Sequence, residues 1–124
     1  MLEHALATGM KVVTNGFAKL QMRLLPDADT RSCILMFHDI LQDGAPVTDE
    51  YACPFNTFCR ILDAYRARGF SFVPLDALLD APYCAIQYKR CAVTFDDGFK
   101  SLSTLAAPYL IKEGVPFTAY VTTG

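Results

Sequence analysis

The feature that most constrains this chain is a short apolar run that ends in two adjacent aspartates. Residues 91–95 read Cys-Ala-Val-Thr-Phe, which is typical of a buried β-strand. Asp96, Asp97 and Gly98 follow at once, and residues 100–113 carry apolar side chains at helical spacing. The two acids are therefore expected on the loop between a strand and a helix, at the sheet edge where α/β proteins bind ligands. Because neighbouring carboxylates repel each other unless a cation or a shared proton relieves them, this pair predicts a functional site.

Three more segments have the character of buried strands, and helices alternate with them. The expected strands are residues 33–37, 70–73 and 117–121, with a helix between Pro54 and Gly69, a helical turn at 75–80, and loops at 41–50 and 81–90. This alternation predicts an α/β fold with a parallel sheet and right-handed crossovers. Since a closed β/α barrel usually needs roughly 200 residues or more, four strands predict either a small open sheet or a partial, truncated (β/α) barrel.

The first 31 residues are expected to form a separate element. Apolar residues recur there every three or four positions, which predicts an amphipathic N-terminal helix, and residues 26–31 form a polar break. The chain is thus divided into a helix with linker, residues 1–31, and a main domain, residues 32–124. The apolar positions are Leu2, Leu6, Met10, Val13, Phe17, Leu20 and Leu24.

Composition restricts the partners and the compartment. A net charge of −2 and a pI near 5.5 give no electrostatic reason to expect nucleic acid. No run approaches the roughly 18 apolar residues of a membrane span, and the first residues lack the basic start of a signal peptide. The five cysteines include no C-x-x-C pair, which favours a reducing compartment over a disulfide framework. We therefore expect a cytoplasmic location.

Four short motifs follow one another along the chain. They are Ile34-Leu-Met-Phe-His38, Gly69-Phe-Ser-Phe-Val-Pro-Leu75, Thr94-Phe-Asp-Asp-Gly98 and Gly114-Val-Pro-Phe-Thr-Ala-Tyr-Val121. In order and separation they resemble the polysaccharide deacetylases of the NodB-homology group. The resemblance runs from about Ser32 to Gly124, and the T-F-D-D-G element is its most specific part.

The resemblance implies a hydrolase that removes N-acetyl, sometimes O-acetyl, groups from a carbohydrate substrate with acetylated amino sugars. It implies that Asp96 is the general base and that Asp97 is a ligand of a divalent metal, commonly zinc. The chemistry agrees, because a bound cation lowers the pKa of water to about 7 and polarises the carbonyl group. A neighbouring carboxylate can then take the proton of that water.

The sequence departs from the family in its histidines. The family completes its metal site with an H-x-x-x-H element after the fourth strand, whereas this sequence contains only His4 and His38. A catalytic zinc typically has three protein ligands. His38, at the end of an expected strand, is a weak candidate ligand beside Asp97. We therefore expect an incomplete site that is weakly active or inactive alone, in a domain that self-association or a second chain would complete.

Other interpretations of these residues remain open. Asp97 could cap the following helix, a role worth about 1 kcal/mol, and His38 could be a hydrogen-bonded residue at a strand end. The chain could be a non-catalytic truncated or partner-completed α/β module. It could also be a magnesium-binding phosphoryl-transfer or receiver-type domain, although such domains place their acid pair after the first strand rather than the third. The sequence predicts no substrate-binding residues, and it assigns the aromatic residues at 55, 58, 65, 109 and 117 to the core.

Overall fold

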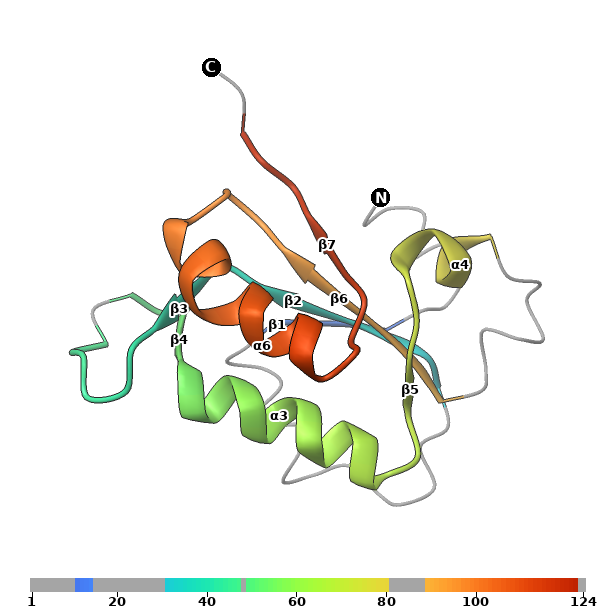
Figure 1. Cartoon of the computed structure of the whole chain (residues 1–124). Coiled ribbons are helices and arrows are strands. Elements are labelled where there is room, and N and C mark those ends of the chain that lie inside the picture. The colour runs from blue at the N-terminus through green and yellow to red at the C-terminus, as the bar shows by residue number, and fades with distance from the viewer. Residues whose placement is uncertain (1–10, 15–30, 48, 81–88, 123–124) are drawn as a thin grey trace.

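A parallel β-sheet forms the centre of the molecule (Figure 1). The structure, a computed structural model, describes residues 11–14, 31–47, 49–80 and 89–122. The sheet strands are β1 (Lys11–Thr14), β2 (Cys33–Phe37), β5 (Ser71–Phe72), β6 (Arg90–Phe95) and β7 (Phe117–Ala119). Their order is β1-β2-β6-β5, with β7 also paired to β6, and every pair is parallel. The predicted α/β fold with parallel strands is confirmed.

β5 and β7 share one side of β6. Ser71 pairs with Arg90 at the start of β6, whereas Phe117 pairs with Val93 nearer its end. The carboxyl ends of β2, β6 and β7 therefore meet at one edge of the sheet, where the predicted acid pair begins.

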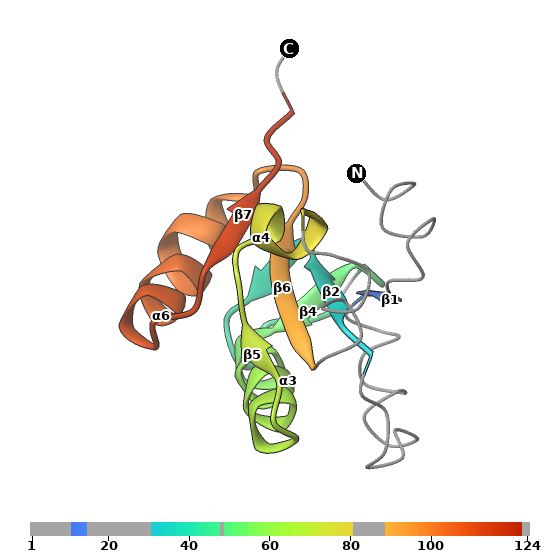
Figure 2. The same ribbon diagram turned by 90° about the vertical axis from the view of Figure 1, so that its right-hand side faces the viewer.

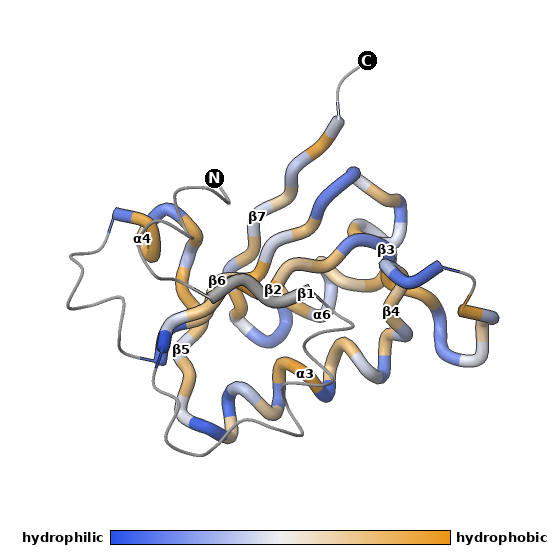
Figure 3. The backbone as a smooth tube through the Cα atoms, turned by 180° about the vertical axis from the view of Figure 1, so that it is seen from behind, coloured by the Kyte–Doolittle hydropathy of each residue, from blue (hydrophilic) through white to orange (hydrophobic). Residues whose placement is uncertain are grey.

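The helices follow the apolar spacing of the sequence. They are α3 (Phe55–Ala67), α4 (Leu75–Leu79), the π-helical segment η1 (Leu102–Ala106) and α6 (Ala107–Lys112). α3 buries one face through Phe58, Ile61, Leu62 and Tyr65, and its hydropathy alternates along its length in Figure 3. It ends before Gly69, whose φ of 86° a residue with a side chain rarely adopts.

The two faces of the sheet carry different cores. Cys33, Leu35 and Phe37 of β2 and the odd-numbered residues of β6 pack against α3 and α6, which lie on the same side of the strands (Figures 1 and 2). On the opposite face, Ile34 and Ala92 pack against Leu75 and Leu78 of α4. Side chains of successive strand residues point to opposite faces of the sheet. The face to which the residue just after a strand points therefore follows from the last residue of that strand.

A second, small sheet was not predicted. β3 (Asp39–Leu41) and β4 (Ala52–Pro54) pair in parallel, with Ile40 opposite Cys53. Both of these side chains are buried. The predicted loop at residues 41–50 is thus shorter than expected, because Leu41 belongs to β3. β4 begins at Ala52, just after the predicted loop.

The predicted N-terminal helix is wrong at the four residues that the structure describes there. Lys11–Thr14 is strand β1, which pairs with β2 from Lys11 opposite Cys33 to Thr14 opposite Met36. The run Val12-Val13-Thr14 consists of β-branched residues, which favour a strand, and β2 offers a hydrogen-bonding edge. The remainder of that predicted helix, with His4, lies outside the described residues, and the boundary after residue 31 stays a prediction. Within the described parts of the chain, no helix is long and apolar enough to cross a membrane.

Candidate functional site

Three neighbouring strands each place one polar side chain at the carboxyl edge of the sheet. His38 follows β2, Asp96 follows β6 and Tyr120 follows β7. The amide of Asp96 donates to the carbonyl of Phe37 over 2.9 Å, and the amide of Tyr120 donates to the carbonyl of Phe95 over 2.8 Å. These bonds extend the β2–β6 and β6–β7 hydrogen-bond ladders by one residue, so the three residues lie side by side.

The same three residues share one face of the sheet. Phe37 pairs with Phe95, which pairs with Ala119, and both phenylalanines belong to the core beneath α3 and α6. The next residue on each strand therefore points to the opposite face. α3 and α6 lie on the other face, so the three side chains point away from these two helices (Figure 2).

Asp96 and His38 are the closest pair of titratable groups at this edge. Asp96 Oδ2 lies 3.8 Å from His38 Nε2, and their side chains are 29% and 14% exposed. Burial raises the pKa of the Asp96 carboxyl above its usual value; His38 opposes this shift and the charge of Asp97 adds to it. His38 Nδ1 is buried and has no hydrogen-bond partner among the described residues. The prediction that His38 ends a strand beside β6 is confirmed.

Asp97 and Gly98 form a left-handed turn after Asp96. Their φ angles are 71° and 61°, and aspartate is one of the few side chains that tolerate this region. A Cβ atom at Gly98 would lie 3.0 Å from Val121 Cγ1, so both conformation and space favour glycine. The following helix begins at Lys100, so Asp97 lies outside the capping position directly before it.

Asp39, a nearby acid, has a structural partner. Ser101 Oγ donates to Asp39 Oδ1 over 2.6 Å and accepts the amide of Ile40 over 3.0 Å. This hydroxyl ties β3 to the start of the helix that follows the acid pair. Asp39 therefore holds the loop in place, which makes it a useful control for the role of Asp96.

The predicted zinc site stays a prediction in the described part of the chain. Asp97 and His38 are the candidate ligands at this edge, and a carboxylate oxygen and an imidazole nitrogen are both ordinary zinc donors. Among the residues that the structure describes, no three His, Cys, Asp or Glu side chains converge on one point. A metal held here would thus draw further ligands from outside those residues or from solvent.

Two tyrosines at this edge were missed from the sequence. Tyr120 is 39% exposed, and burial together with the charge of Asp96 raises its pKa. Tyr51 is 49% exposed, and its ring centroid lies 4.9 Å from that of His38. The alternation of side chains along a strand could have identified Tyr120. Thr118 pairs with Thr94, so the residues two positions later, Tyr120 and Asp96, also lie side by side. Tyr51 carries no such signal, because it precedes a strand of only three residues.

The described residues form an α/β protein with a parallel sheet. Its candidate site, which contains Asp96, lies at the carboxyl ends of the strands. No protein-family model and no curated protein matches the sequence. A solved structure does match: IcaB from Ammonifex degensii is 28% identical, with a TM-score of 0.58 over 74% of this chain. The match covers 38% of the IcaB chain, so this chain spans well under half of that protein. The similarity supports a polysaccharide deacetylase-like fold.

Proposed function

We propose that this chain is a polysaccharide deacetylase-like protein whose parent reaction is metal-dependent hydrolysis of N-acetyl, or O-acetyl, groups on a carbohydrate. The observation that carries the proposal is the position of Asp96, partly buried beside His38 at the carboxyl edge of a parallel sheet. The T-F-D-D-G motif and the structural similarity to IcaB support the same assignment.

Asp96 has the properties of a general base. Its raised pKa makes the carboxylate a stronger base than an exposed aspartate. In the proposed reaction Asp96 takes a proton from water, the water oxygen bonds to the acetyl carbonyl carbon, and the bond from that carbon to the sugar nitrogen breaks. The proton held by Asp96 passes to the leaving amine nitrogen, and acetate is released.

The residues beside Asp96 have separate roles in this proposal. The imidazole of His38 lies 3.8 Å from the carboxylate of Asp96. Asp97 and His38 would hold the divalent metal, zinc by the family resemblance, which would polarise the carbonyl group and lower the pKa of water. Calorimetry with zinc tests this assignment: we expect weak binding that Asp97→Asn weakens further, and unchanged binding in that variant would contradict it.

The function is tested by acetate release from acetylated chito-oligosaccharides in the presence of zinc. Asp96→Asn keeps the shape of the side chain but removes the base, so we expect the rate to fall by about 100-fold or more. Asp39→Asn is the matched control, because an amide oxygen can still accept the hydrogen bond from Ser101. A rate that survives Asp96→Asn, or that falls equally in both variants, would contradict the proposed base.

A second candidate is a non-catalytic module that binds carbohydrate. It is favoured by one observation, namely that the described residues bring no three metal ligands together. Oligosaccharide binding without acetate release, at any zinc concentration, would identify this alternative.

A further inference from the structure

Four side chains form a row along the carboxyl edge of the sheet. Tyr51 contacts His38 ring to ring at 4.9 Å, and His38 Nε2 lies 3.8 Å from Asp96 Oδ2. Tyr120 lies beyond Asp96, because β7 pairs with β6 on the side away from β2. The reactive pair therefore has one tyrosine on each side.

The two flanking rings differ from the aromatic residues of the core. Phe37, Phe58 and Phe95 are at most 1% exposed and make the core, whereas Tyr51 and Tyr120 expose 49% and 39% of their surface. The amide of Tyr51 donates to Asp49 Oδ1 over 2.9 Å, and that of Tyr120 donates to the carbonyl of Phe95 at the end of β6 over 2.8 Å. Two exposed flat rings therefore flank the pair of His38 and the proposed base.

We propose that Tyr51 and Tyr120 are substrate-binding residues that stack on sugar rings on both sides of Asp96, so that the site takes an oligosaccharide rather than a single sugar. This inference rests on the proposed function, because it concerns the substrate of the same site. The C–H faces of a pyranose ring are apolar and weakly positive, and they match the negative face of an aromatic ring. When one sugar lies beneath Asp96, the sugars before and after it in the oligosaccharide stack on the two tyrosines.

The test compares the binding of N-acetylglucosamine and of tetra-N-acetylchitotetraose by calorimetry. We expect the tetrasaccharide to bind more tightly to the wild-type chain. Tyr51→Leu and Tyr120→Leu keep apolar bulk but lose the flat ring, so each should weaken tetrasaccharide binding by about three- to tenfold. Tyr51→Phe and Tyr120→Phe keep the ring and should bind within about twofold of wild type.

Controls separate stacking from loss of structure. Ile111 is 72% exposed on α6, away from the row, so Ile111→Ala should bind like wild type. The phenylalanine variants keep the test decisive if a leucine variant melts early, because a large loss of binding in a folded phenylalanine variant contradicts stacking.

The outcomes distinguish this inference from the function on which it rests. Tetrasaccharide binding that is unchanged in both leucine variants would overturn the role of the tyrosines and leave the function of Asp96 standing. Equal affinity for the single sugar and the tetrasaccharide would also overturn it. A wild-type chain that neither binds the tetrasaccharide nor releases acetate would overturn both proposals.

Discussion

The turn at Asp97 and Gly98 places two left-handed residues in succession directly after the proposed base. Aspartate tolerates this conformation and glycine prefers it, so the D-D-G sequence is suited to reverse the chain within two residues of the strand. The close approach of Val121 adds a packing reason for glycine at the second position. The motif thus serves the backbone as well as the chemistry.

Gly98→Ala should therefore be more destabilising than the same change at another left-handed glycine. Gly44 has a φ of 88° and nothing within 4 Å of an added Cβ, so Gly44→Ala should cost about 1 kcal/mol for conformation alone. Gly98→Ala should cost roughly 1–2 kcal/mol, because the new methyl group also meets Val121. Urea denaturation of both variants measures the difference, and equal losses would show that Val121 plays no part.

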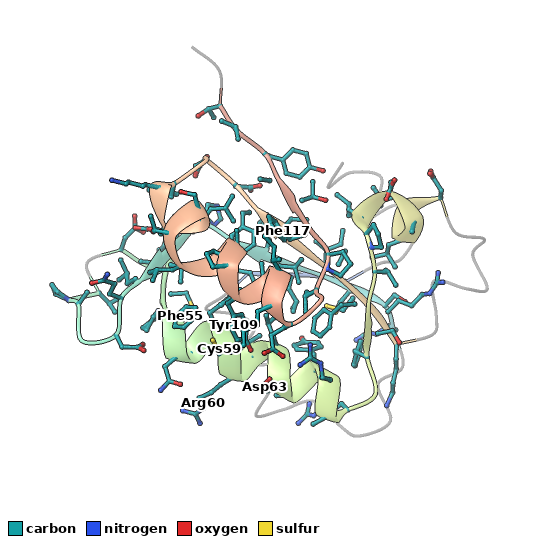
Figure 4. The ribbon with its side chains drawn as sticks, viewed as in Figure 1. Phe55, Cys59, Arg60, Asp63, Tyr109 and Phe117 are labelled. Carbon is teal, nitrogen blue, oxygen red and sulfur yellow. The ribbon has the colours of Figure 1, made fainter. Side chains whose placement is uncertain are left out.

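Tyr109 gives a prediction of pH dependence far from the proposed site. It lies between α3 and α6, beside Phe55 and Cys59 (Figure 4). Burial raises the pKa of its phenol to about 12, and the neighbouring Cys59, Asp63 and Glu113 add to the shift. Because the unfolded chain loses this proton near pH 10, the stabilising contribution is complete below that pH and is lost as the pH rises toward 12.

The check is a titration of tyrosinate absorbance in the folded protein. Tyr109→Phe should remove a phase centred near pH 12, whereas Tyr51→Phe should leave that phase in place. The difference in stability between the two variants should change as the pH rises from 10 to 12. A Tyr109 that titrates with the exposed tyrosines would contradict its burial between the helices.

At the scale of single residues, the sequence identified Asp96 and His38 as residues at strand ends but missed the two tyrosines beside them. The pattern of residues 91–98 is enough to place an acid at the end of a strand. The 3.8 Å approach of His38 depends on β2 lying beside β6, which is a property of strand order and not of either motif. Tyr51 reaches His38 through an irregular segment that has no sequence period.

At the scale of elements, α3 holds the covered face of the sheet through aromatic contacts. The ring of Phe58 lies 4.9 Å from that of Phe37 and 5.9 Å from that of Phe95. It also contacts Tyr109 of α6 at 6.0 Å. One side chain thus joins both strands of the site to both helices behind them.

Phe58→Ala should destabilise the fold by about 3–5 kcal/mol, because it opens a cavity at a fully buried position. The matched control is Ile111→Ala, an exposed helical position at which the change should stay within about 0.5 kcal/mol. Chemical denaturation measures both. A loss below 1 kcal/mol for Phe58→Ala would mean that the ring is not the junction of strands and helices described above.

The elements that could be predicted are those with a sufficiently long run of patterned apolar residues or with a glycine at one end. α3, α4, β2 and β6 fall close to the predicted ranges. β1 was misread because apolar residues recur every three or four positions in 2–24, which favours a helix, whereas the local run of β-branched residues signals a strand. β3 and β4 have three residues each, too few to show any period.

At the scale of the whole molecule, the sheet divides structural and functional roles between its faces. α3 and α6 cover one face and form the main core, while the other face bears α4 near the start of the strands and the proposed site at their ends. A partial β/α barrel stays a prediction for the fold.

The most direct test of this account is a crystal structure of the Asp96→Asn variant with tetra-N-acetylchitotetraose. We predict that one acetamido group lies within hydrogen-bonding distance of residue 96, with neighbouring sugar rings against Tyr51 and Tyr120. A sugar bound at the helical face of α3 and α6, or at the carboxyl edge with its acetamido group turned away from residue 96, would contradict the account.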